Sequence, residues 1–324
     1  MDFVISRIAQ SIVVLFVVSI LVFFGVYMIG NPVYVLIDPR SSQEAIDLAI
    51  KSLGLDRPAW EQYLTFLWRV FHGDFGVSYV YSQPALHLIA ERLPATLELV
   101  FTAFVFGAVI GLPLGLIAGK SNNGMLSRSI SAASIMGFSL PTFWVGIMLV
   151  LVFSVHFHVL PPSGRGEIGT ILGIPTSLAT WNGIQHLMLP ALNLSLYPAA
   201  LMIRLVRSGV QENLRAEFVL FARSKGLTPR RVLVTYVLRN ALIPVVTVMG
   251  IVAGTLIAFA VVTETVFAWP GTGKLIIDSI RMLDRPVVIA YVLFTVVLFT
   301  MINLAADLVC ALIDPRLRVA RARP

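Results

Sequence analysis

The run that comes nearest to a nucleotide-binding motif is Gly115-Leu-Ile-Ala-Gly-Lys-Ser121. A phosphate-binding loop needs four residues between its first glycine and the Gly-Lys pair, because the backbone amides must wrap around the phosphates. Here only three residues intervene, and the glycine that the motif would need at position 114 is replaced by Leu114. The run also lies at the end of an apolar segment, whereas a phosphate-binding loop follows a soluble strand. We therefore expect no ATP binding through such a loop, and we predict no cofactor-binding residues in this chain.

Motifs typical of hydrolases and metal sites are also missing from the sequence. Neither His-Glu-x-x-His nor Gly-x-Ser-x-Gly occurs. His156 and His158 flank Phe157 without nearby acids or cysteines, and histidines at a membrane interface are a more common explanation of such a pair than a metal site. We predict no catalytic residues and no metal ligands.

A few ionisable or polar residues fall within or beside the apolar segments. Asp307 could pair with Arg204 or Arg207, a structural role that we favour over a proton relay. We expect Glu264 at the membrane interface. Polar residues of such segments mostly join helices to one another, but some line solute pathways. The candidate pathway-lining residues are Asn193, Ser195, Thr255 and Asn303.

The elements that position these residues follow from composition. The chain has 324 residues, of which 57% are hydrophobic and 13% charged, whereas a soluble domain carries about a quarter charged residues. Stretches of about 18 or more apolar residues are long enough to cross a membrane. Six are present, namely Ile8–Ile29, Ala95–Ala118, Ile130–Phe157, Leu187–Val206, Leu242–Val262 and Val287–Ile313. None alternates like a barrel strand, so we predict an all-α membrane protein with six transmembrane helices.

The distribution of cations predicts the orientation, since loops rich in Lys and Arg stay in the cytoplasm. Fifteen of the 24 Lys and Arg lie in segments 1–7, 119–129, 204–241 and 314–324, which places both termini inside. Anionic lipids then account for the net charge of +7 without a nucleic-acid partner. The predicted parts are 1–29 with the first membrane helix, an extracytoplasmic helical interval 30–94, a core 95–313 containing a cytoplasmic loop 208–241, and a cytoplasmic tail 314–324.

The interval 30–94 contains a predicted helix that begins near Pro58. Its apolar stripe of Trp60, Leu64, Leu67 and Phe71 recurs at helical spacing. Such a stripe suits either the bilayer surface or a protein partner.

The loop 208–241 is patterned as a helix, a turn and a second short helix. Apolar residues mark one helical face, namely Val210, Leu214, Phe218, Phe221 and Ala222. Gly226 predicts a left-handed stop, Thr228 a helix cap and Pro229 the first residue of the second helix.

The run Phe221-Ala-Arg-Ser-Lys-Gly-Leu227, followed by Leu238-Arg-Asn-Ala-Leu-Ile-Pro244, closely resembles the cytoplasmic EAA loop of binding-protein-dependent ABC importer permeases. More narrowly, the chain is similar to the first of the two permease subunits in the dipeptide/oligopeptide branch (the DppB/OppB type). Supporting runs include Gly73-Asp-Phe-Gly76, Glu91-Arg-Leu-Pro-Ala-Thr-Leu97, Thr263-Glu-Thr-Val-Phe267 and Asp314-Pro-Arg316. The sequence departs from the general pattern at Leu220, at Leu238-Arg239 and at Gly30-Asn-Pro32.

The resemblance implies the type I ABC importer permease fold in the inner or plasma membrane and an import function without enzymatic activity. The solute would be a dipeptide or oligopeptide, with glutathione, a nickel chelate or a sugar as other members' substrates. It implies four kinds of partner: a second permease subunit (DppC/OppC type), two ATPase subunits that hold ATP and Mg²⁺, an extracytoplasmic solute-binding protein, and membrane lipid.

The resemblance also assigns roles to residues. The ATPase-coupling candidates are Phe218, Phe221, Ala222, Arg223, Lys225, Gly226, Leu227, Arg230 and Arg231. The candidate contacts of the binding protein are Trp60, Tyr63 and Trp68. The alternative is a secondary transporter driven by an ion gradient, which would need a coupling-ion site at the membrane midplane and would be supported by an inverted repeat. Neither is evident in the sequence.

Overall fold

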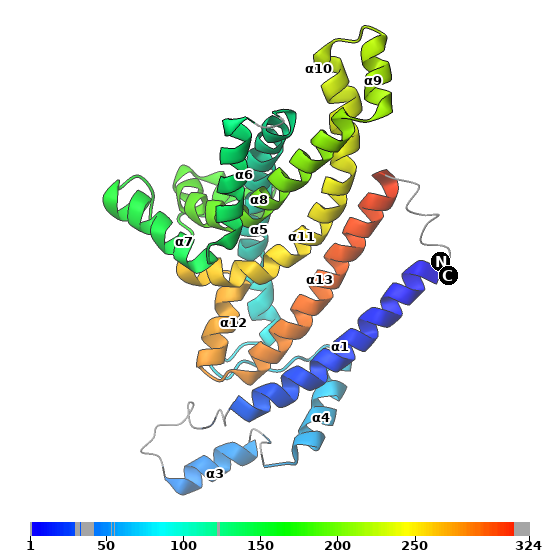
Figure 1. The fold of residues 1–324 in the computed structure, drawn as a ribbon. Coiled ribbons are helices and arrows are strands. Elements are labelled where there is room, and N and C mark those ends of the chain that lie inside the picture. Colours follow the sequence, from blue (N-terminus) through cyan, green and yellow to red (C-terminus); the bar gives the residue numbers. More distant parts are fainter. Residues whose placement is uncertain are drawn as a thin grey trace. The chain divides into compact units, whose positions relative to one another are not determined.

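The computed structural model describes residues 2–29, 33, 42–52, 54, 56–121 and 124–313. The predicted tail 314–324 and the turn Gly30-Asn-Pro32 lie outside these residues, as does the side chain of Asp307. The first half contains α1 (Asp2–Ile29), α3 (Gln43–Ser52), α4 (Ala59–Phe71), α5 (Ala85–Lys120), α6 (Met125–Ser139), α7 (Thr142–Leu149) and the π-helical η1 (Val150–His156). The second half contains β1 (Gly169–Ile171), β2 (Ile174–Thr176), the 3₁₀-helical η2 (Ser177–Ala179), α8 (Trp181–Leu214), α9 (Glu217–Ser224), α10 (Pro229–Arg231), the π-helical η3 (Val232–Leu238), α11 (Arg239–Val266), α12 (Thr272–Arg281) and α13 (Arg285–Ile313). Figure 1 labels the α-helices.

The chain divides into two compact units. Unit 1 comprises Met1–Ala95 and Pro270–Thr300, and unit 2 comprises Thr96–Trp269 and Met301–Pro324. The division falls within the continuous helices α5 and α13, so each of these helices contributes to both units. The predicted boundaries at residues 30, 95 and 314 rest on membrane topology and stay predictions.

Long apolar helices dominate the described part of the chain. Four are long and apolar enough to cross a membrane, namely α5, α8, the continuous helix Pro229–Val266 and the segment Arg285–Ala305 of α13. A bent pair of helices brings the number to five if the pair forms one span. The predicted first span lies within α1, where the apolar stretch with described side chains is the shorter Ile12–Val26.

The predicted span Ile130–Phe157 is not a single continuous helix. It is broken between α6 and α7, and the two halves are bent by 106°. Pro141 causes the break, because proline lacks a backbone N–H and pushes the preceding residue out of the helical region. Leu140 accordingly has an extended backbone with ψ of 137°.

Unit 2 is built around α8, which packs against α6, α7 and α11. A second contact joins α8 to α5 through glycines at every fourth residue, namely Gly107, Gly111, Gly115 and Gly119. A Cβ atom added at these positions would lie 2.7–3.0 Å from the side chains of Pro198, Met202, Val206 and Val210, respectively. Small residues at this spacing let two helix backbones approach closely. Gly115 and Gly119 therefore serve helix packing.

Unit 1 packs α4 against α1. Its core contains Phe23, Tyr63, Ile289 and Leu293. The Tyr63 hydroxyl lies 2.9 Å from the Ser19 hydroxyl, and its ring centroid lies 5.3 Å from that of Phe23. Because Tyr63 is only 8% exposed, its assignment as a surface contact is wrong: it lies on the inner face of α4, where it fastens this helix to α1.

The segment 158–186 of unit 2 contains a small hairpin that the sequence did not predict. β1 pairs antiparallel with β2, with Gly169 opposite Thr176. The two connecting residues, Leu172 and Gly173, both have positive φ, of 52° and 81°. This is the backbone geometry of a type I′ turn, whose twist matches that of the flanking strands.

Candidate functional site

The segment 215–231, which we call the elbow, connects α8 to the continuous helix 229–266. In Figure 1, α9 and α10 project beyond the ends of α8 and α11. The prediction of one helical face from Val210 to Ala222 is wrong, since α8 ends at Leu214 and the extended Ala216 caps a separate α9. Val210 packs against Gly119 of α5, whereas α9 packs against η3. These two packing surfaces differ, so a single helix could not serve both.

Gly226 ends α9 as predicted, with φ of +75°. The Leu227 N–H donates to the Ala222 carbonyl at 3.4 Å, and the Gly226 N–H donates to the Arg223 carbonyl at 2.9 Å. This pattern resembles the Schellman ending of a helix, in which a left-handed residue satisfies the last carbonyl groups. No atom lies within 4 Å of a Cβ built on Gly226, so the backbone conformation is the reason for glycine here.

The chain then returns as one helix, not as a separate short helix. Pro229 is its first residue, as predicted. Thr228 precedes it with an extended backbone, but its side chain makes no capping hydrogen bond. α10, the π-helical η3 and α11 follow without a break to Val266. A displacement of the elbow would therefore act directly on the end of a long apolar helix.

The exposed face of α9 is aromatic and cationic. Val219 and Ala222 are its buried residues, so Ala222 faces η3 and is not available as a contact for another protein. Phe221 is 62% exposed, and Phe218 and Leu220 are exposed as well. The exposure of Leu220 was not predicted, because the helical spacing counted from Val210 is interrupted at Ala216, where α8 and α9 are separate helices.

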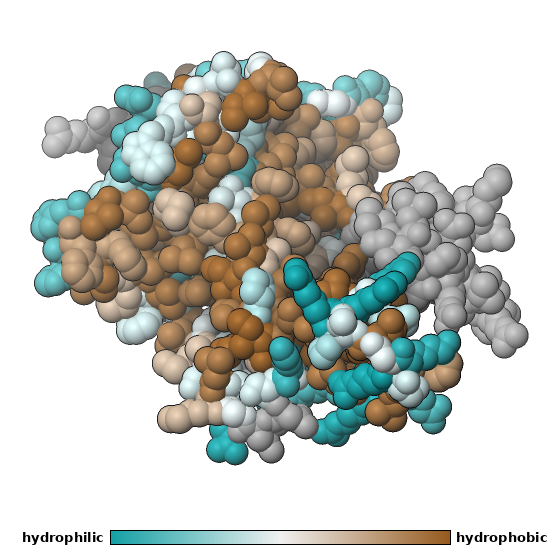
Figure 2. Space-filling view, turned by 90° about the horizontal axis from the view of Figure 1, so that it is seen from above, coloured by the Kyte–Doolittle hydropathy of each residue, from teal (hydrophilic) through white to brown (hydrophobic). Residues whose placement is uncertain are grey.

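The predicted cations of the elbow surround these apolar side chains. Arg223, Lys225, Arg230 and Arg231 are all exposed, and none forms an ion pair within the described residues. The Lys225 ammonium lies 4.5 Å from the centroid of the Phe221 ring. Figure 2 looks onto this end of the molecule and shows hydrophilic side chains gathered together, with hydrophobic surface among and beside them. Such a surface suits a soluble protein partner with an apolar groove and acidic groups.

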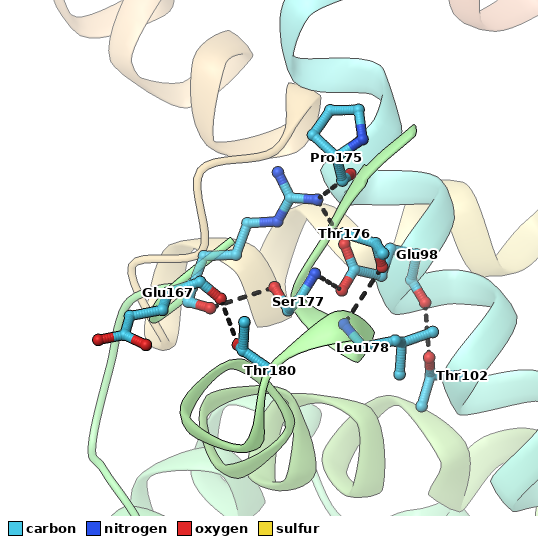
Figure 3. A network of polar contacts seen from close by, with 9 residues as sticks. Glu98, Thr102, Glu167, Pro175, Thr176, Ser177, Leu178 and Thr180 are labelled. Atoms are coloured by element: carbon cyan, nitrogen blue, oxygen red, sulfur yellow. Dashed lines mark hydrogen bonds and ion pairs between the residues drawn. The ribbon is translucent and has the colours of Figure 1, made fainter. Parts of the chain in front are cut away.

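A second set of polar residues, which we call the hairpin network, comprises Glu98, Arg165, Glu167, Ser177 and Thr180. The Glu98 carboxylate forms an ion pair with Arg165, and their side chains are only 5% and 9% exposed. Glu98 also accepts the Ser177 N–H at 2.8 Å. The Thr180 hydroxyl donates to the Glu167 carbonyl at 2.6 Å (Figure 3). The network fixes the segment that carries β1 and β2 to α5.

Other buried polar contacts join the long helices of unit 2. Glu264 is fully buried within the protein and accepts a hydrogen bond from the Thr96 hydroxyl at 2.7 Å. Its expected depth at the membrane interface stays a prediction. Asn193 donates to the Thr263 hydroxyl at 3.1 Å. The roles of Glu98 and Thr96 were not predicted from the sequence, because both residues lie in or beside a mostly apolar stretch.

The four candidate pathway residues occupy different environments. Asn193 and Ser195 are fully buried in unit 2, and the Ser195 hydroxyl donates to the carbonyl of Leu192. Thr255 is half-buried and donates to the carbonyl of Val252. Asn303 is half-buried on α13. Asn193 thus joins α8 to α11, whereas Ser195 bonds within its own helix. The pathway assignment of all four residues stays a prediction.

The remaining predicted contacts lie on α4. Trp60 and Trp68 are 58% and 69% exposed, and Leu64 and Phe71 are exposed beside them. Leu67, which the sequence places in this stripe, instead packs against the core of unit 1. Among the described residues, no group of three or more His, Cys, Asp and Glu side chains could hold a metal ion.

The comparisons with known proteins agree with one another. The family model of the binding-protein-dependent transport system inner membrane component matches residues 111–319, and the model of its N-terminal part matches residues 1–100. The dipeptide transport system permease protein DppB of Escherichia coli (strain K12) is 36% identical, covering 98% of this chain and 99% of that protein. The di/tripeptide transport system permease protein DppB of Pseudomonas aeruginosa (strain UCBPP-PA14) is 37% identical, covering 99% and 100%.

A third relative is the glutathione transport system permease protein GsiC of Escherichia coli (strain K12), 36% identical over 98% of this chain and 99% of that protein. Among solved structures, an inward-facing conformation of the MetNI methionine ABC transporter has a TM-score of 0.55 and 19% identity, covering 71% of this chain and 97% of that chain. This last likeness concerns the fold alone.

Proposed function

This chain belongs to the family of binding-protein-dependent transport system inner membrane components, and we propose that its solute is a peptide or a closely related small molecule. Like its relatives, it is a permease subunit, which is a transport component and not an enzyme. Their names mention dipeptides, di- and tripeptides and glutathione, which all combine a peptide bond with a free carboxylate. That shared chemistry supports the choice of solute.

The proposed arrangement has six membrane spans with both termini in the cytoplasm. The apolar helices of the structure, the α1 helix and the concentration of cations in the elbow support it. A second permease subunit forms the other half of the pathway, two ATPase subunits bind from the cytoplasm, and a binding protein delivers the solute from outside. ATP and Mg²⁺ are held by the ATPase subunits.

The elbow transmits the movement of the ATPase to the pathway. Phe218 and Phe221 bury their apolar surface in a groove of the partner, and the removal of this surface from water favours the contact. Because Val219 and Ala222 hold α9 on η3, a displaced α9 carries η3 and α11 with it. The pathway switches between outward and inward access because the nucleotide-loaded ATPases bind one of the two permease states more tightly.

The observation that carries this proposal is the exposed aromatic and cationic face of α9 on a frame fixed by Gly226. Replacing Gly226 with valine puts a β-branched residue at φ of +75° in otherwise open space. The strain amounts to about 1–3 kcal/mol and displaces α9 from the following helix. We expect solute transport and solute-stimulated ATP hydrolysis by the reconstituted complex to fall at least about tenfold.

Gly173→Val is the matched control. Gly173 has φ of +81° and open space around it, but it lies at the hairpin turn and not in the elbow. Similar losses in both variants would mean that strain alone, wherever it falls, impairs the protein. Full activity of Gly226→Val would contradict the coupling role of the elbow.

A further inference from the structure

Unit 1 contains a cavity of about 340 Å³ that none of the roles above uses. Its lining comes from α4, the segment 72–79 and the beginning of α13, together with Phe23 of α1, Lys51 of α3, Gly54 and Arg57. A cavity of this size is at the lower end of the range that small-molecule sites occupy, and it is large enough for a molecule of peptide size. In the proposed topology it opens on the side from which the solute arrives.

The lining combines an aromatic wall with a cationic rim. Phe23, Phe66 and Phe75 belong to the apolar core of unit 1 or pack against it, and each presents part of its surface to the cavity. The cationic residues of the lining are Lys51, Arg57, Arg69 and Arg285. A molecule with an apolar body and an anionic end would satisfy both parts of this lining.

Three cations of this rim, Lys51, Arg57 and Arg69, form no ion pair within the described residues. Asp74 is the one carboxylate of the lining, and its Oδ1 accepts the Gly76 N–H at 2.8 Å. Within the described residues, no hydrogen bond engages the side chains of these three cations, and the Arg57 carbonyl accepts from the Gln62 side-chain amide at 2.8 Å. Like charges gathered in one cavity repel one another, and an anion that enters the cavity relieves this repulsion.

Acids that could neutralise the rim are nearby in the sequence but make no pair with it. Asp56 precedes Arg57, and Glu61 follows it by four residues, yet neither forms an ion pair in the described structure. The buried Asp284 accepts hydrogen bonds from the Ser78 hydroxyl and the Tyr79 N–H, which engages both of its oxygens. The lining itself thus contains four cations and one carboxylate.

Tyr79 supplies a neutral donor to the same cavity. Burial raises the pKa of its phenol above the ordinary value. The Arg285 guanidinium lowers this pKa, the Asp284 carboxylate raises it and the Arg69 guanidinium lowers it, but the net pKa stays raised. The phenol thus stays protonated at neutral pH and is able to donate a hydrogen bond to an anionic oxygen.

We propose that this cavity binds the carboxylate end of the incoming solute, with Arg69 as a principal contact and the aromatic wall against the apolar part of the solute. The inference rests on the proposed import of a peptide-like molecule and adds a binding site for it within the permease. A guanidinium beside an aromatic surface is well suited to a carboxylate, because it donates in a planar fork and tolerates an apolar neighbour.

The test measures binding of alanyl-phenylalanine, as the free acid and as the C-terminal amide, to the permease–ATPase complex in phosphatidylcholine nanodiscs without binding protein. Saturation-transfer NMR reports each Kd. We expect the free acid to bind at least about tenfold more tightly than the amide, since a charge-assisted hydrogen bond is lost in the amide. Arg69→Gln should weaken binding of the free acid by about tenfold and leave that of the amide unchanged, and Arg69→Lys should retain part of the difference.

The matched control is Arg281→Gln, which removes an exposed arginine of α12 in the same unit but outside the cavity. Equal thermal midpoints for the two glutamine variants establish that Arg69→Gln folds. Equal Kd values for acid and amide, or for the two glutamine variants, would overturn the proposal. A second result would also overturn the proposal. If phosphatidylglycerol in the nanodiscs displaces the dipeptide from the wild type, and Arg69→Gln abolishes this competition, then the cavity binds a lipid phosphate instead of the solute.

Transport by the same nanodiscs, with binding protein and ATP added, separates this proposal from the proposed function. If the wild-type complex transports no peptide, the choice of solute fails whatever the NMR shows. If it transports the dipeptide and Arg69→Gln binds the free acid as Arg281→Gln does, only the cavity site fails.

Discussion

The elbow and the hairpin network both lie between long helices, and both concentrate charge in a chain of which only 13% is charged. The two regions differ in whether these charges, among the described residues, are buried and paired or exposed and unpaired. In the hairpin network, Glu98 and Arg165 are buried against one another and against the backbone of the 158–186 segment. In the elbow, the cations are exposed and form no ion pair within the described residues.

The difference separates residues that hold the fold from residues that serve another molecule. A buried ion tolerates no loss of its partner, because the remaining charge would stay desolvated. An exposed cation costs the fold little when it is removed, since water already solvates it. Substitutions in the hairpin network should therefore change stability, and those in the elbow should change association.

Glu98→Ala tests the stability side and should have the largest effect. It leaves the Arg165 guanidinium buried without its carboxylate, which costs about 3–5 kcal/mol. The change would be measured as a lower free energy of unfolding of the purified complex. Glu91→Ala is the control on the same helix, since Glu91 is exposed and its one ion pair within the described residues is with the exposed His87. A loss of less than about 1 kcal/mol for Glu98→Ala would remove the distinction between the two regions.

Phe221→Ala tests the association side. The exposed Phe221 ring makes the fold little more stable, so unfolding should change by no more than about 0.5 kcal/mol. Binding of the ATPase subunit, measured by titration in detergent, should weaken by about 2 kcal/mol, which is typical of a central aromatic contact. Phe101→Ala is the matched control, because Phe101 is 65% exposed on α5, away from the elbow. Unchanged ATPase affinity of Phe221→Ala would exclude this ring from the interface.

The smallest effect comes from two threonines that each precede a helix. The Thr180 hydroxyl accepts the Gly183 N–H at 3.0 Å as the cap of α8, whereas Thr228 makes no capping hydrogen bond in the elbow. Thr180→Ala should therefore lower the free energy of unfolding by about 1 kcal/mol, and Thr228→Ala should leave it nearly unchanged. Thermal unfolding of the two variants side by side measures the difference, and equal midpoints would contradict it.

Some breaks in the fold are visible in the sequence and others are not. The bend between α6 and α7 is predictable from Pro141, because a proline restricts the backbone of the residue directly before it whatever the tertiary contacts are. Gly226 likewise announces its turn through its own backbone freedom. The break at Ala216 has no proline or glycine that would predict it. It follows from tertiary packing, since α8 packs on α5 while α9 packs on η3.

The aromatic residues of α4 show the same limit. Trp60, Tyr63 and Trp68 have similar chemistry, and helical spacing alone does not tell which side meets α1. The contact with Phe23 buries Tyr63 and leaves both tryptophans exposed. The glycines of α5 recur visibly at every fourth residue, but their partner α8 is distant in the sequence.

By itself the sequence determined the helical membrane character, the absence of a nucleotide loop and the left-handed turn at Gly226, because each depends on local composition or on the backbone of one residue. Only the tertiary structure decided which charges are buried, which face of α9 and α4 is exposed, and which cations share a cavity. These features depend on contacts between segments far apart in the chain, and a periodic pattern defines a helix face without naming the element that covers it.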